Sequence, residues 1–297
     1  MILKKVFLII VYNSLCLLPV AILGQAGARS LQTPDTLKTA LGGSSHSLFA
    51  GGGYGSNMIY LGSTISHNQP YGYWNVTYGY KNQFYASASA VHLSGIDPFL
   101  SFYIGALNYS HAFNSWFDIA TGVYRYQVPS SLTDTLFRSF TYGDLTFGFD
   151  WKLLYSKLSV GGLFSEENQA YFQIRNSRYF QTPEFFNGKA NISFDPYANL
   201  LFGTLIEVET TAETSVFASS PGRKWRQNDT SHGTATITST SERFGIMEVD
   251  FGLPVAFNTD FMTIEAEVNY VLPLYNEPVY RSPKGFIFML SGFFRIF

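Results

Sequence analysis

Apolar and polar residues alternate with a period of two along most of this chain from His46 onward. The alternating segments are about 10 to 15 residues long, and turn-rich stretches separate them. Strands in soluble β-sandwiches are shorter, at about 5 to 6 residues. Long amphipathic strands are typical of a membrane-spanning β-barrel, where one face of each strand meets lipid and the other faces the lumen.

The clearest hairpin lies near the C-terminus. Apolar residues recur at every second position from Met247 to Phe257 and again from Met262 to Leu272. If both apolar stripes lie on one side of an antiparallel pair, Phe257 is opposite Asp260 and Asn258-Thr259 forms a two-residue turn.

The full pattern predicts an all-β fold, an antiparallel up-and-down transmembrane barrel of twelve strands. The expected strands are 46–66, 70–80, 83–93, 98–111, 114–128, 138–151, 153–165, 168–181, 193–210, 243–257, 260–272 and 284–297. Short turns should then lie at one end of the barrel and long loops at the other. This count requires 46–66 to be one long strand bent at its glycines. Fourteen strands is the alternative.

The composition supports a barrel. Aromatic residues make up 18% of the chain and charged residues only 13%, and 28 Phe and 20 Tyr would give a soluble protein a sticky surface. Beyond the N-terminal region there is no apolar run long enough for a helical membrane span. The net charge of −2 gives no indication of nucleic-acid binding.

The N-terminus has the layout of a secretory signal peptide. Lys4 and Lys5 precede an apolar run that ends in small residues, so we expect a signal at 1–24, a lead-in at 25–45 on the periplasmic side, and the barrel at 46–297. Cys16, the only cysteine, lies inside this signal. The mature chain is therefore expected to have no disulfide and no thiolate metal site, and no cofactor is implied.

The chain ends in GFFRIF, with aromatic residues at Phe293 and Phe297. This ending resembles the C-terminal strand signal of Gram-negative outer-membrane proteins, and the Gln-rich region near Gln25 resembles barrels of the Bacteroidota type. The resemblance implies insertion by the barrel-assembly machinery and a location among outer-membrane lipid and lipopolysaccharide. It leaves the activity open.

The candidate chemistry is an acidic cluster on the lumen face. In the register above, Asp250 is opposite Glu267, and Glu248 and Glu265 flank them. The preceding strand adds Asp195 and Glu207, and the candidate basic partners are Arg175 and Lys157. Like charges across strands are unfavourable without compensation. The cluster could be a salt-bridge network that fills a narrow lumen, or it could form a cation-preferring passage or cation site.

We therefore expect a narrow pore or small-solute channel with an acidic lumen. One alternative is a sealed structural or surface-binding barrel that acts through outer loops, above all 211–242. A second is an outer-membrane enzyme of lipid hydrolase or protease type, for which His92 is the candidate histidine. Since alternation places Ser89 on the opposite face from His92, the sequence does not predict a catalytic residue.

Overall fold

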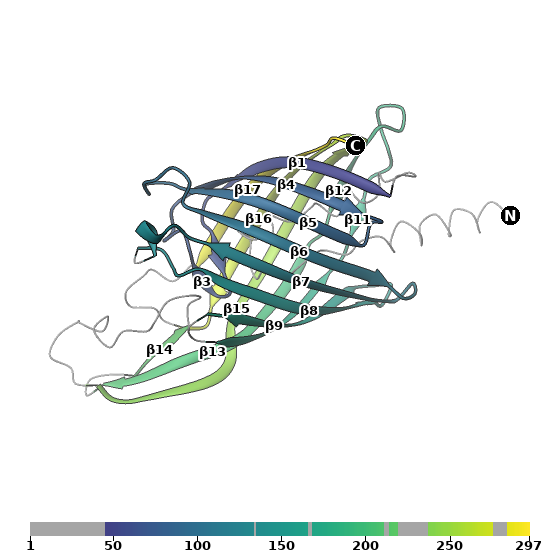
Figure 1. The fold of residues 1–297 in the computed structure, drawn as a ribbon. Helices are drawn as coiled ribbons and strands as arrows, with labels where there is room; N and C mark the ends of the chain where they lie inside the picture. Colours follow the sequence, from purple (N-terminus) through teal and green to yellow (C-terminus); the bar gives the residue numbers. More distant parts are fainter. Residues whose placement is uncertain (1–44, 134, 166–167, 211–213, 219–236, 276–283) are drawn as a thin grey trace.

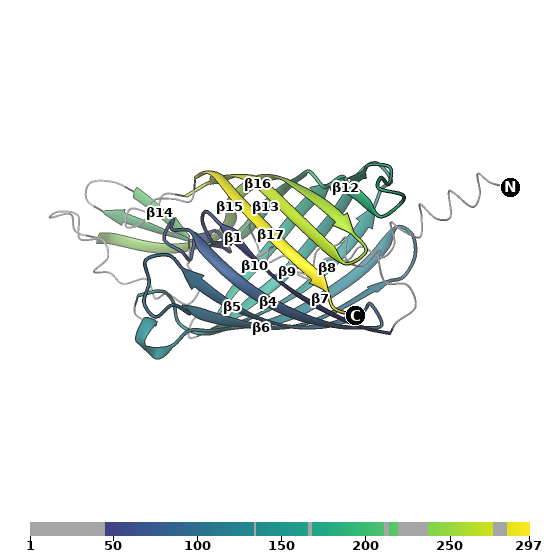
Figure 2. The same cartoon turned by 90° about the horizontal axis from the view of Figure 1, so that it is seen from above.

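The chain folds into one closed antiparallel barrel in the computed structural model (Figures 1 and 2), which describes residues 45–133, 135–165, 168–210, 214–218, 237–275 and 284–297. Each barrel strand pairs with the next along the chain, and the last pairs with the first. The expected signal, the lead-in up to 44 and most of the 211–242 loop lie outside the described residues.

Twelve strands form the barrel wall, as the alternation predicted. They are β1 (His46–Gly55), β4 (Tyr71–Tyr80), β5 (Phe84–Leu93), β6 (Phe102–Ala112), β7 (Phe117–Gln127), β8 (Phe140–Asp150), β9 (Tyr155–Phe164), β10 (Gln169–Ser177), β13 (Tyr197–Thr210), β15 (Ile237–Thr259), β16 (Met262–Pro273) and β17 (Gly285–Arg295). We call the end with the short connections at 81–83, 113–116, 151–154 and 260–261 the turn end, and the opposite end the loop end. Among the described residues, no helix is long and apolar enough to cross a membrane.

The C-terminal strand closes the barrel. β17 pairs with β1, and Phe293 lies opposite Gly51. A Cβ at Gly51 would overlap the Phe293 ring, so this ring can pack against β1 only because residue 51 has no side chain. Phe297 reaches the start of β1, where its carbonyl oxygen accepts a hydrogen bond from the N–H of Leu48 (3.0 Å).

The outer wall is apolar and the lumen side is mixed. Large apolar side chains are half exposed on the outside, among them Trp74, Val76, Leu107, Val123, Val160, Phe251, Phe288 and Leu290. Their neighbours in sequence point inward, and most of them are buried. Aromatic rings pair on the outer wall near the turn end, where the Phe84 and Tyr109 centroids are 4.7 Å apart and those of Phe117 and Phe149 are 5.4 Å apart. Such rings anchor a barrel at the membrane interface.

Tyrosine rings cover inward-facing glycines of neighbouring strands. A Cβ added at any of these glycines would overlap the ring: Tyr73 covers Gly53, Tyr71 covers Gly55, Tyr142 covers Gly161 and Tyr197 covers Gly252. We expected the first glycine run to bend one long strand. Instead, the glycines at 51–55 leave room for inward rings, and the strand ends at Gly55.

The expected strand 46–66 is therefore wrong in its second half. After Gly55 the chain turns into the barrel and forms a small hairpin from β2 (Ile59–Tyr60) and β3 (Ser63–Thr64) before β4 begins at Tyr71. In the sequence, the apolar residues of this hairpin look like the continuation of a strand with a lipid-facing side. In the structure, the same residues are apolar because they are buried inside the lumen.

The register of the C-terminal hairpin also differs from the prediction. Phe257 pairs with Ile264 rather than Asp260, and Asp250 pairs with Val271 rather than Glu267. The last pair of the ladder is Asn258 with Thr263, so the turn contains residues 259–262 instead of Asn258-Thr259. Within it, the Thr259 hydroxyl accepts from the N–H of Met262 and donates to its carbonyl (both 3.0 Å). The shift is even, so the side chains from Glu248 onward keep their predicted faces. Met247 is the exception: it was expected on the apolar outer face and points into the lumen at a β-bulge.

Two predicted strands are broken near the turn end. The expected strand 193–210 consists of β12 (Ala190–Phe194) and β13, interrupted at Asp195-Pro196. β12 pairs with the last residues of β15, and β13 pairs with the rest. The expected strand 168–181 likewise divides into β10 and the short β11 (Phe180–Gln181).

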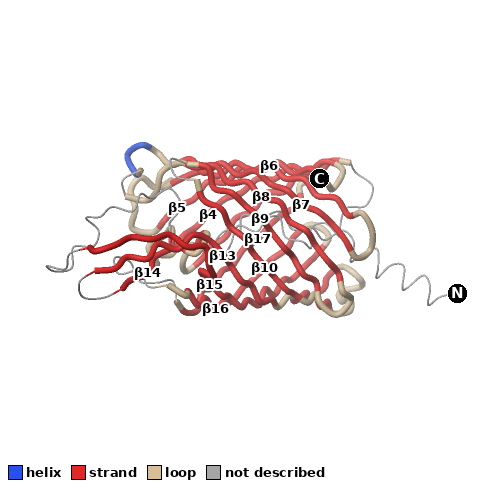
Figure 3. The backbone as a smooth tube through the Cα atoms, turned by 90° about the horizontal axis from the view of Figure 1, so that it is seen from below, coloured by secondary structure: helices blue, strands red, loops and turns tan. Residues whose placement is uncertain are grey.

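At the loop end, β13 and β15 extend past the barrel wall and carry β14 (Thr214–Ala218) on the edge of β13 (Figures 1 and 3). We call this part the projecting sheet: the paired segments 205–210, 214–218 and 237–243. It was not predicted, because the expected tenth strand, 243–257, begins only at 243 and no strand was expected between 211 and 242.

Candidate functional site

The lumen holds most of the acidic and basic residues that the sequence made candidates, and several residues that it did not predict. Its loop half is filled by the segment 56–70, which we call the plug. Met58, Ile59, Tyr60 and Leu61 are each at most 2% exposed, although they lie in a connection between strands. Residues this buried contribute a packed core rather than a mobile loop.

Aromatic residues of the barrel wall surround the plug. The Tyr60 ring lies 4.9 Å from that of Tyr126, 5.5 Å from Phe140 and 6.1 Å from Tyr142. Ring pairs at these distances stabilise beyond the area that they bury. At the hairpin tip, the carbonyl of Gly62 accepts a hydrogen bond from the Tyr275 hydroxyl, which ties the plug to the β16–β17 loop.

A network of hydrogen bonds centred on Asn57 connects the two ends of the plug. The Asn57 side-chain oxygen accepts hydrogen bonds from the hydroxyls of Thr64 and Ser66 (2.8 Å each), and its amide donates to Asn68 (2.8 Å). The Ser66 hydroxyl also accepts from the N–H of Met58 (2.8 Å). The Asn57 side chain thus provides hydrogen-bond partners for Thr64, Ser66 and Asn68, while the apolar residues of the plug pack in the lumen.

Asp250 lies in a hydrogen-bond chain that crosses three strands. Gln173 on β10 donates to the Asn199 side-chain oxygen (2.5 Å), and the Asn199 amide donates to Asp250 on β15 (2.5 Å). Asn199 and Asp250 are fully buried. Sequence reasoning missed Gln173 and Asn199, although both lie on the same alternating face as predicted members of the cluster.

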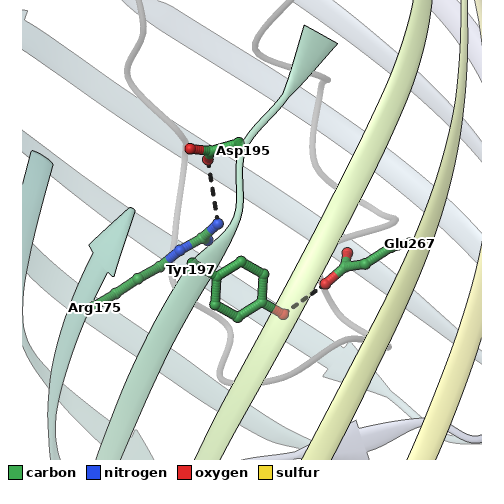
Figure 4. Close-up of polar contacts among 4 residues, drawn as sticks. All are labelled: Arg175, Asp195, Tyr197 and Glu267. Atoms are coloured by element: carbon green, nitrogen blue, oxygen red, sulfur yellow. Dashed lines mark hydrogen bonds and ion pairs between the residues drawn. The ribbon is translucent and has the colours of Figure 1, made fainter. Parts of the chain in front are cut away.

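Glu267 belongs to a second network (Figure 4). The Tyr197 hydroxyl donates to Glu267 (2.6 Å), the Arg175 guanidinium lies 4.1 Å from the Tyr197 ring centroid, and Arg175 forms an ion pair with Asp195 at 3.5 Å. Tyr197 therefore links the predicted base Arg175 to an acidic residue three strands away. Tyr197 itself was not predicted.

A β-bulge places two consecutive side chains in the lumen. Leu201 pairs with Glu248 but Phe202 pairs with Ile246, so Met247 is the extra residue, and both Met247 and Glu248 are fully buried. A Cβ at Gly62 of the plug would lie 2.8 Å from the Met247 methyl group. The bulge thus sets a buried carboxyl group beside the residue that supports the plug.

The remaining predicted residues are distributed unevenly. Glu265 faces the lumen, half buried, opposite Ser291. Lys157 is 5% exposed, pairs with Arg175 across the β9–β10 ladder and lies 5.3 Å from the Tyr155 ring centroid. Glu207 does not join the cluster. It lies eight residues beyond Asn199 on β13, about 26 Å away at the rise of a strand, and forms an ion pair with Arg243 at 3.6 Å.

His92 has no catalytic arrangement with the neighbouring serine. Its ring stacks on Phe99 with centroids 4.3 Å apart, and Nδ1 lies 2.6 Å from the Phe99 carbonyl oxygen. Ser89 is buried on the lumen side and accepts a hydrogen bond from Asn75 (2.8 Å), so the two side chains lie on opposite faces, as predicted. Within the described part of the chain, no three His, Cys, Asp or Glu side chains are placed to hold a metal ion.

No family model matches the sequence, and no curated protein matches it. Solved structures of barrels are similar in fold. A NanC porin has a TM-score of 0.44 at 12% identity, covering 83% of this chain and 98% of that one. LpxR from Salmonella typhimurium has a TM-score of 0.40 at 7% identity, covering 84% and 99%. The β domain of the Bordetella autotransporter BrkA has a TM-score of 0.35 at 10% identity, covering 86% and 100%.

These identities are too low to carry an activity from one chain to the other. The closed barrel itself decides the class, because its backbone polar groups pair around the full circle and its outer wall is apolar. This is an outer-membrane β-barrel protein. The outer membrane supplies the lipid that its outer wall requires.

Proposed function

We propose that this barrel is closed in its resting state and acts at the cell surface through the projecting sheet. The observation that carries the proposal is the position of the plug, with Met58, Ile59, Tyr60 and Leu61 buried among rings of the wall. An open diffusion channel needs a water-filled path between both ends. The burial of an aromatic core in the loop half supports a lumen that is closed there.

The acidic residues fit this proposal as parts of the structure. Asp250 accepts from Asn199, Glu267 accepts from Tyr197, and Asp195 pairs with Arg175. Groups held by neighbours in this way are poorly suited to exchange ligands with a passing ion, because each exchange would leave a buried donor without its acceptor. These contacts therefore support a structural network that fills the lumen better than a cation passage or cation site.

The decisive experiment is conductance in a planar bilayer. We expect the refolded mature protein to be silent, whereas a variant with residues 57–69 replaced by a short Gly-Ser turn shows discrete openings. β1 and β4 pair as far as Gly55 and Tyr71, so a short turn can connect them. Steady, ion-conducting openings of the unaltered protein would overturn the proposal.

A second candidate function is a channel that opens when the plug leaves. It is favoured by the polar turn half, where Thr77, Asn108, Thr146 and Ser159 are buried on the lumen side. In the plug-replaced variant, Glu265→Gln should then reduce cation preference in the reversal potential. If the plug-replaced variant has no cation preference, or if Glu265→Gln leaves that preference unchanged, Glu265 does not select ions.

A further inference from the structure

A single charged side chain faces outward from strands β4 to β10. Arg125 is exposed, while its neighbours Tyr124 and Tyr126 are buried in the lumen at 2% and 1%. The other charged residues of these strands lie at positions that alternate to the lumen face: Asp118, Asp144, Asp150, Lys157 and Arg175. Arg125 thus lies alone on a wall of apolar and small side chains.

Its position along the strand sets the environment of the charge. Arg125 is two residues from the loop end of β7, opposite Gly105 on β6 and Thr141 on β8. Exposed aromatic residues lie at the same level, with Tyr103 opposite Gln127 and Phe164 opposite Thr141. Such residues mark the headgroup layer, where an outward arginine costs about 0 to 1 kcal/mol rather than the 2 to 4 of the membrane midplane.

The guanidinium is only partly satisfied by the protein. It donates to the Thr141 hydroxyl (3.2 Å) and to the Gln127 side-chain oxygen (3.4 Å), and both acceptors are neutral. In the described part of the chain, no carboxylate forms an ion pair with it. Beside it, a Cβ at Gly105 would meet no atom within 4 Å, so one flank of the site is open.

We propose that Arg125, oriented by Thr141 and Gln127, binds the phosphate of a lipid in the membrane leaflet at the loop end. Guanidinium has five N–H donors in a planar fork that fits two phosphate oxygens at once. The site faces lipid rather than the lumen and lies at headgroup depth, so the phosphate that reaches it is one carried by a lipid. This binding is independent of whether the lumen conducts.

Titration of the detergent-solubilised protein with diphosphorylated lipid A tests the proposal. The same lipid A without its phosphates is the comparison, and native mass spectrometry counts the bound molecules. We expect the phosphorylated form to bind about tenfold more tightly, which corresponds to one strong charge-assisted contact. Arg125→Gln should remove this preference, and Arg125→Lys should keep part of it because the charge remains but the fork is lost.

Lys81→Gln is the matched control, since it removes one positive charge from an exposed side chain at the turn end. Its preference for phosphorylated lipid should equal that of the unaltered protein. The proposal is overturned if Arg125→Gln keeps the preference or if Lys81→Gln loses it equally. It is also overturned if inorganic phosphate at the lipid's concentration displaces the lipid.

Discussion

Tyr197 on β13 crosses the backbone of Gly252 on β15 and donates a hydrogen bond to Glu267 on β16, 2.6 Å away. One side chain of β13 therefore holds a carboxyl group of β16 across the intervening β15. On its other side the same ring contacts Arg175. This makes Tyr197 the junction between the basic and acidic parts of the lumen.

Replacing Tyr197 by Phe should lower the free energy of unfolding by about 1.5 to 3 kcal/mol, because Glu267 is 3% exposed and loses the hydrogen bond from this hydroxyl. Urea unfolding in lipid vesicles, followed by tryptophan fluorescence, measures the change. Tyr103→Phe is the control, since Tyr103 is 44% exposed on the outer wall, and it should change stability by less than about 0.5 kcal/mol. Equal effects of both changes would contradict a special role for the Tyr197 hydroxyl.

Gly252→Ala should destabilise the barrel by about 1 to 3 kcal/mol, because the new methyl group would overlap the Tyr197 ring. At Gly292, in contrast, a Cβ would meet no atom within 4 Å, so Gly292→Ala should be tolerated. The same unfolding assay compares them. In a Tyr197→Ala background the cost of Gly252→Ala should fall, and additive costs would show that the ring is not the cause.

Asn57→Ala should loosen the plug, because it removes three hydrogen bonds among residues 57–68. We expect brief openings in bilayer recordings at a frequency above that of the unaltered protein. Gln69→Ala, at an exposed position of the same segment, should leave the recordings unchanged. A silent Asn57→Ala barrel would mean that the aromatic contacts alone hold the plug.

The projecting sheet should be accessible from outside the cell. Ser241 is exposed on β15 within this sheet, and Asp260 is exposed in a connection at the turn end. A membrane-impermeant maleimide applied to intact cells should label Ser241→Cys but not Asp260→Cys. Since Cys16 is the only cysteine and lies in the expected signal, the mature chain should give no background. Labelling of Asp260→Cys alone would show that the turn end, and not the projecting sheet, faces the outside of the cell.

The sequence by itself determined the strand count, the closed antiparallel architecture and the face on which most strand side chains lie. Met247, at the β-bulge, is an exception that the alternation did not predict. A two-residue period fixes these features because a strand in a membrane wall has one apolar face and one lumen face. Thus Glu248, Asp250, Glu265 and Glu267 lie on the predicted side, even though the register of their hairpin is shifted.

Only the tertiary structure decided which of these residues meet. Alternation is unchanged by a shift of two or four residues, so it could not distinguish Val271 from Glu267 as the partner of Asp250. It also could not separate the plug from a longer first strand, since Tyr60 and its neighbours are apolar in either arrangement. Their burial depends on rings from β7 and β8, which are distant in sequence and come together only when the barrel closes.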